Sequence, residues 1–169
     1  YTYYQRMLHL ENEVITDEER GCFIFDEKEY YEQEEKDAAV QVKKQQLYDI
    51  VYEDLHDITT VLCPINNKNE PMWESGAKNL VLAIALAMLE DSESPKLELT
   101  KEKYNFFSIT KVATNTENDC EELIHYFKGR SPLSKAVSLS KQVLDASDKT
   151  RGSYLSSTFD NLSMFEDQT

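Results

Sequence analysis

The chain has 169 residues, enough for one domain that buries about two thirds of its unfolded surface without disulfide or metal support. Glycine and proline number only 4 each, which disfavours the turn-rich sandwiches and barrels. The formal net charge is −14, which disfavours nucleic-acid binding by the chain as a whole because such binding is mostly electrostatic.

The cysteine content favours reduced thiols in a core. Cys22, Cys63 and Cys120 are odd in number and far apart, unlike a disulfide framework. A zinc site would have to recruit a histidine, but neither a Cys-x-x-Cys nor a His-x(3–5)-His spacing occurs. We therefore predict no metal and no cofactor.

The first 62 residues give one weak and one strong pattern. Residues 2–14 can form a short helix, and residues 19–25 can be either an extended stretch or a turn. Residues 29–62 have helical periodicity, with Pro64 just beyond their end. Residues 26–37 are polar on every side, which is typical of a solvated projection and, alternatively, of a contact surface.

Residues 71–90 predict a buried central helix. Pro71 suits a first helical turn, and an apolar stripe follows it. The longest apolar run, residues 80–89, is shorter than the roughly 20 residues that a bilayer requires, so we expect a helix packed on several sides. Gly76 inside it predicts the close approach of a neighbouring helix.

The last third of the chain predicts four shorter helices. The first covers residues 108–113, and the second starts at a capping box of Thr116 and Asp119. The third starts at Ser131 and Pro132, with Leu133, Ala136, Val137, Val143 and Leu144 facing inward. The fourth follows Ser147. The prediction is thus an all-α bundle of about six helices with no convincing pair of strands, forming a single domain over residues 1–169.

The sequence contains no recognisable catalytic motif. Its glycines form no phosphate-binding loop, and no Gly-x-Ser-x-Gly nucleophile turn is present. We predict that this domain carries no catalytic residue and is not itself an enzyme. A small helical hydrolase is the weakest alternative, since no nucleophile can be paired with a base.

Charge is distributed unevenly. Residues 1–39 hold 12 acidic and 4 basic residues, and we predict an acidic docking face there. This acidic face consists of Glu27, Glu29, Glu32, Glu34 and Glu35. Residues 128–151 form a basic window with a net charge of +4. Its candidate contacts to DNA or a partner are Lys128, Arg130, Lys135 and Lys141, although ordinary solvated side chains on amphipathic helices are the commoner interpretation.

Two blocks of the sequence resemble type IV coupling proteins, the membrane-anchored ATPases that deliver substrates to conjugation and secretion channels. The first block, NNKNEPMWESGAKNLVLAIALAMLED, resembles an Asp-Pro-Phe-Trp, Ala and Asn-Leu pattern. It matches at Pro71, Trp73, Glu74, Ala77, Asn79 and Leu80. The second block, DKTRGSYLSSTFDNLSMFED, resembles a helix that begins with Thr-x-Gly-Ser. It matches at Thr150, Gly152, Ser153, Leu155, Leu162 and Phe165.

The resemblance covers residues 45–167 and looks closest to conjugative elements of Gram-positive bacteria. Met72 stands where the family often has an aromatic residue. Residues 1–44 match no part of the family, and we interpret them as a variable acidic extension. Because the first residue is Tyr1 and the earliest methionine is Met7, we expect either a processed product or a piece of a longer protein.

The resemblance implies an all-α substrate-recognition domain, with the ATP site of the parent protein elsewhere. It implies binding of a relaxase or relaxosome component and its presentation to the motor domain. DNA contact would be weak, with no direct membrane contact, on the cytoplasmic side of the bacterial membrane. A free-standing acidic adaptor or DNA mimic is the alternative. Trp73 is either an exposed contact or, as we expect, a packing anchor of the core.

Overall fold

The computed structural model describes residues 1–97, 99–114 and 120–166. The chain divides into two compact units, an N-terminal unit of residues Tyr1–Asp54 and a C-terminal unit of residues Leu55–Thr169. The division falls inside the longest helix, ten residues beyond the boundary at residue 44 that the resemblance suggested. The fold is 68% helix with seven α-helices in the described part of the chain, which confirms the predicted all-α class.

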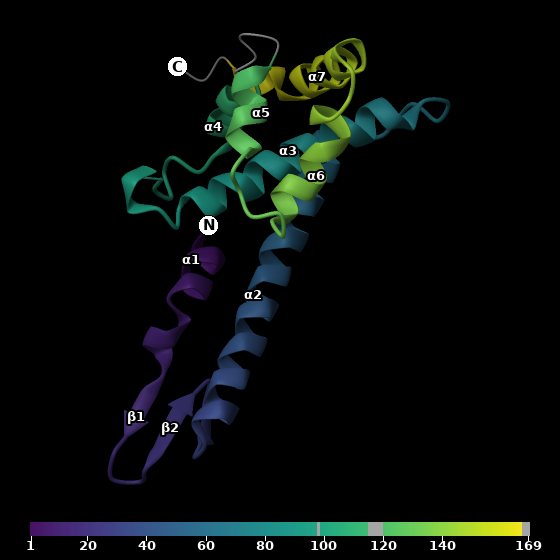
Figure 1. The fold of residues 1–169 in the computed structure, drawn as a ribbon. Coiled ribbons are helices and arrows are strands. Elements are labelled where there is room, and N and C mark those ends of the chain that lie inside the picture. The colour runs from purple at the N-terminus through teal and green to yellow at the C-terminus, as the bar shows by residue number, and fades with distance from the viewer. Residues whose placement is uncertain (98, 115–119, 167–169) are drawn as a thin grey trace. The chain divides into compact units, whose positions relative to one another are not determined.

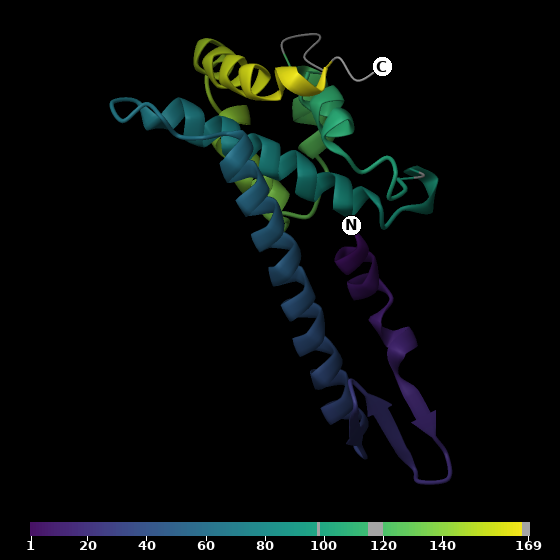
Figure 2. The same ribbon diagram turned by 180° about the vertical axis from the view of Figure 1, so that it is seen from behind.

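The N-terminal unit combines helices with a small sheet (Figures 1 and 2). Helix α1 (Thr2–Leu8) and a 3-10 turn (Leu10–Glu13) precede the strands, and α2 (Gln33–Leu62) follows them. The antiparallel sheet has the order β1 (Ile15–Asp17), β2 (Cys22–Phe25), β3 (Lys28–Tyr30). The prediction of no strand pair is therefore wrong for residues 15–30.

Residues with positive φ explain these hairpins. Asp26 and Glu27 connect β2 to β3 with φ angles of 50° and 64°, the geometry of a two-residue type I′ turn. Gly21, with φ of 66°, lies in the turn between β1 and β2. Because β3 takes up Glu29, helix α2 begins at Gln33 and not at residue 29.

A small apolar cluster holds the N-terminal unit together. Leu10, Phe25, Val40 and Leu47 are buried in it and come from the 3-10 turn, β2 and α2. Met7 and three other partly buried side chains pack around them. The cluster joins the sheet to one face of the first half of α2.

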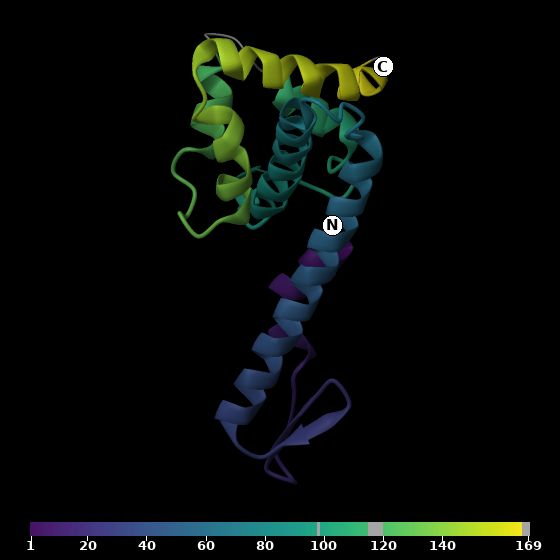
Figure 3. The same cartoon turned by 90° about the vertical axis from the view of Figure 1, so that its right-hand side faces the viewer.

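The C-terminal unit is built around α3 (Pro71–Asp91), as predicted. Helices α4 (Phe106–Ala113), α6 (Lys135–Leu144) and α7 (Asp148–Leu162) each pack against it. Figure 3 shows α6 and α7 on different sides of α3. The short helix α5 (Glu121–Phe127) contacts α6, and 3-10 turns lie at Pro95–Leu97 and Ser163–Phe165.

Helix α3 is buried over most of its length. All residues from Leu80 to Leu89 are buried. Among the described residues α3 is the one helix with the length and composition to cross a bilayer, but 67% of its most apolar window is already buried by the protein. The core helix of a globular protein has the same length, composition and burial.

Gly76 confirms the predicted close approach. A Cβ atom built on it would lie 2.2 Å from Cε1 of Tyr154 on α7. Only a residue without a side chain leaves room for this ring. The packing of α3 on α7 therefore depends on glycine at this position.

In the last third of the chain, the predicted start of one helix is wrong, and that of another lies outside the described residues. Helix α6 is capped by Ser134, whose hydroxyl accepts from the N–H of Val137, and not by Ser131. Leu133 consequently lies before the helix and is 94% exposed, so its predicted inward position is wrong. Thr116 and Asp119, the expected capping box, lie outside the described residues.

Candidate functional site

The acidic face lies on the hairpin and the start of α2. Glu27 occupies the β2–β3 turn, Glu29 lies in β3, and Glu34 and Glu35 occupy the first turn of α2. All of them are exposed, as is Glu32. The positive end of the α2 dipole favours carboxylates in its first turn.

One member of the acidic face is already paired. Glu29 forms an ion pair with Arg20 and accepts a hydrogen bond from the Tyr31 hydroxyl at 3.1 Å. Within the described part of the chain, no ion pair involves the carboxylates of Glu27, Glu32, Glu34 or Glu35. These four remain available to a basic partner.

The basic window contains two kinds of residue: the lysines are exposed, whereas the arginines make contacts within the fold. Lys128, Lys135 and Lys141 are exposed and come from the end of α5 and the two ends of α6. Arg151 donates to the carbonyl oxygens of Leu144 and Ala146, both at 2.9 Å. The lysines can meet a partner, whereas Arg151 stabilises the end of α6.

Arg130 also has a structural environment, which its sequence position does not reveal. Its side chain is only 13% exposed. Nη2 lies 2.8 Å from Oδ1 of Asp91, and Nη1 lies 3.2 Å from Oε2 of Glu90 and from the Ala87 carbonyl oxygen. Arg130 therefore forms ion pairs with two carboxylates and caps the C-terminal end of α3.

Two hydroxyl groups complete this cluster at the end of α3. Tyr126 donates to Oδ2 of Asp91 at 2.6 Å, and Ser134 donates to Oε1 of Glu90 at 2.5 Å. Burial raises the pKa of Tyr126, and the hydrogen bond to Asp91 raises it further. Burial by itself would lower the pKa of Arg130, but the charge of Asp91 raises it overall, so the guanidinium stays charged.

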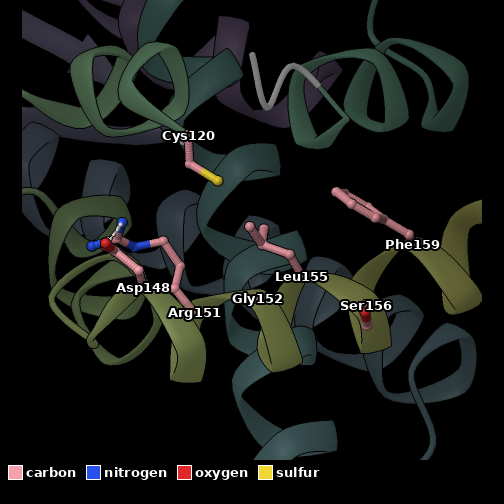
Figure 4. A pocket seen from close by; sticks show the side chains of 7 residues that line it. All are labelled: Cys120, Asp148, Arg151, Gly152, Leu155, Ser156 and Phe159. Atoms are coloured by element: carbon pink, nitrogen blue, oxygen red, sulfur yellow. Dashed lines mark hydrogen bonds and ion pairs between the residues drawn. The ribbon is translucent and has the colours of Figure 1, made fainter. Parts of the chain in front are cut away.

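A pocket of about 260 Å³ lies between α7 and the residue that precedes α5 (Figure 4). The side chains of Cys120, Leu155 and Phe159 converge on it, while the guanidinium of Arg151 turns toward Asp148. Asp148 accepts from Arg151 at 3.3 Å. The one carboxylate among the residues that line this pocket is thus already paired with a guanidinium.

The two blocks that resemble coupling proteins meet where α3 packs on α7. Trp73 in the first block lies against Tyr154 in the second, with ring centroids 4.9 Å apart in an edge-to-face arrangement. Gln142 of α6 joins them, since it accepts from Asn79 and donates to the Tyr154 hydroxyl, each at 3.3 Å. Trp73 is partly buried, so it both packs against α7 and reaches the surface.

A polar pocket of about 430 Å³ opens beside this junction. Its residues come from the segment before α3, the first turn of α3 and one face of α7. They are Asn67, Glu70, Trp73, Glu74, Ser153, Ser156 and Ser157. The resemblance had already singled out Trp73, Glu74 and Ser153. The spacing of the three serines, at i, i+3 and i+4, could have predicted that they share one polar face of the helix.

Among the described residues, no group of three or more histidine, cysteine or acidic side chains is arranged to hold a metal ion. Comparisons with protein-family models, with curated proteins and with solved structures each found no match to this chain.

Proposed function

We propose that this chain is the all-α substrate-recognition domain of a type IV coupling protein. In this role it would bind a relaxase or relaxosome component and present the protein–DNA substrate to the secretion channel. The parent protein would place it on the cytoplasmic side of the membrane, next to a motor domain that holds the ATP site.

The observation that supports this proposal is the contact between the two family-like blocks. Residues 70 or more positions apart in the sequence pack together through Trp73, Gly76 and Tyr154. Three of the positions that carry the resemblance, Trp73 and Glu74 in the first block and Ser153 in the second, line one pocket beside this contact.

The charges of the molecule suggest how a partner would be recruited. Four glutamates on the acidic face, which form no ion pair with any described residue, would attract a basic relaxase or accessory protein. Such attraction increases the association rate more than the affinity. Lys128, Lys135 and Lys141 would provide a weak contact for the DNA strand that travels with it.

The proposal is tested by titrating the purified chain with its cognate relaxase and, separately, with single-stranded DNA. Each titration is made at two salt concentrations. We expect saturable relaxase binding that weakens when Glu27, Glu32, Glu34 and Glu35 are changed to glutamine. A matched control changes Glu121, Glu122, Asp145 and Glu166 to their amides, which removes the same charge from the C-terminal unit. No binding of relaxase at either salt concentration would contradict the proposal.

The unpaired carboxylates also favour a second candidate, a free-standing acidic adaptor or DNA mimic. Such a protein would bind the DNA-contacting surface of its partner and compete with DNA for it. Competition between this chain and DNA for the relaxase would support this alternative. A gene that continues upstream into a phosphate-binding loop would exclude it.

A further inference from the structure

The polar pocket beside Trp73 has a composition that points to a particular kind of ligand. Two carboxylates, three hydroxyl groups, one amide and one indole line it, and none of the seven residues is basic. Carboxylates disfavour an anion in such a space, and hydroxyl oxygens accept hydrogen bonds from a cation.

The carboxylate of Glu74 supplies the negative charge that the start of α3 favours. Its Oε2 accepts the N–H groups of Asn66 and Asn67 at 2.6 and 3.0 Å, which fixes the segment before the helix. A helix N-terminus attracts anions, but here a side chain of the chain itself already occupies that role. The helix end therefore gives no reason for an anionic ligand.

Glu70 is the second carboxylate of the pocket, and it is exposed. In the described ranges it takes part in no ion pair. It occupies the N-cap position of α3, yet its side chain makes no capping hydrogen bond. It is thus available to a cation without loss to the helix.

Trp73 adds an aromatic wall. Tyr154 meets it edge to face, at an interplanar angle of 62°, and its remaining surface lines the pocket. Indole attracts cations more strongly than the other aromatic rings do. An aromatic wall with a nearby carboxylate suits a guanidinium or ammonium group on a flexible apolar stem.

We propose that this pocket binds an arginine or lysine side chain of a partner protein. The identity of that partner rests on the proposed receptor function: it would be the transferred protein. Glu70 would pair with the cation, Trp73 would stack on it, and the serines of α7 would accept its remaining N–H groups.

Trp73 is the only tryptophan of the chain, so its fluorescence reports directly on the pocket. The experiment titrates the full chain with hexa-arginine and hexa-lysine peptides, with hexa-glutamate as the control for the addition of a charged peptide. We expect a saturable change in emission with the basic peptides alone. Glu70→Gln should weaken this binding about threefold or more, the size expected for an exposed ion pair.

The matched control is Glu34→Gln, which removes the same charge from the acidic face and leaves the pocket unchanged. We expect it to weaken peptide binding less than Glu70→Gln does. Circular dichroism checks that both variants keep their helices. A non-saturable change in Trp73 emission, or equal weakening by the two variants, overturns the pocket.

The same variants separate this inference from the proposed function. Relaxase binding that weakens with the acidic-face variant but not with Glu70→Gln overturns the pocket and leaves the receptor function intact. Saturable peptide binding that depends on Glu70, without any relaxase binding, supports the pocket and overturns the receptor function.

Discussion

The N-terminal and C-terminal units differ in how they bury apolar side chains. In the described residues, 7 apolar side chains are buried in residues 1–54 and 24 in residues 55–169. The larger set includes the unbroken run from Leu80 to Leu89, which is buried on every side of α3. Burial of apolar surface is the main favourable term in folding, so the C-terminal unit should be the more stable one.

One arginine ion pair from each unit shows a second difference, in the exposure of its side chains. Arg6 and Glu13 in the N-terminal unit form a two-bonded pair at 2.7 and 2.9 Å with both side chains 41% exposed. Arg130 in the C-terminal unit forms its pairs at 13% exposure. Similar chemistry thus contributes little where Arg6 is exposed and has a structural role where Arg130 is buried.

The largest expected effect comes from truncating one core leucine in each unit. Leu82 is 1% exposed in α3 and Leu47 is 2% exposed in α2, so replacing either by alanine should cost about 2–5 kcal/mol. Hydrogen exchange should show that Leu82→Ala lowers protection in the C-terminal unit and Leu47→Ala in the N-terminal unit. Equal losses in both units from either variant would mean that the two unfold as one.

The second effect concerns the contact of α3 with α7. Gly76→Ala would place a methyl group against the buried ring of Tyr154, and we expect a loss of about 1–3 kcal/mol in the free energy of unfolding. Urea unfolding measures it. Gly152→Ala is the control, because a Cβ atom added to this helical glycine would meet no atom within 4 Å, and it should gain up to about 1 kcal/mol. A stabilising Gly76→Ala would contradict the close packing.

The sequence was most informative where one pattern decided the structure. Helix α3 could be predicted because Pro71 marks its start, apolar residues cover it nearly all round, and Gly76 signals a close neighbour. These signals are local and agree with one another. The burial of residues 80–89 follows from them directly.

The sequence was least informative where tertiary contacts decide the structure. The β2–β3 turn uses Asp26 and Glu27 at positive φ without the glycine that usually marks such a turn, so the hairpin was missed. Two serines compete for the cap of α6, and the choice of Ser134 over Ser131 is tied to its hydrogen bond with Glu90 on another helix.

The candidate sites show the same limit. The positive charge of Arg130 is visible in the sequence, but its partner Asp91 is 39 positions away, so its structural role could not be predicted. The acidic face was predictable as composition, whereas the ion pair that occupies Glu29 was not. The polar pocket combines three segments, and only the fold brings them together.

Removing the arginine should affect stability differently in the part-buried ion pairs of Arg130 and in the exposed ion pair of Arg6. Arg130→Met should cost about 1.5–3 kcal/mol, because it leaves the part-buried carboxylates of Glu90 and Asp91 without their cation. Arg6→Met should cost less than about 1 kcal/mol, since its pair is exposed to solvent. Denaturant unfolding of both variants measures the difference. Equal costs would contradict the structural role assigned to Arg130.

The smallest expected effect is a loss of stability at alkaline pH through Cys63. Its thiol is fully buried, and burial raises its pKa from 9.0 to about 11. An unfolded chain releases this proton near pH 9 while the folded chain retains it, so stability falls as pH rises through this window. Between pH 8 and 9.5 the loss attributable to Cys63 should stay below about 1 kcal/mol. Urea unfolding at several pH values should show a shallower decline of stability with pH in Cys63→Ala. The control, Cys22→Ala, should retain the part of the decline that comes from Cys63. An unchanged decline in Cys63→Ala would contradict the assignment.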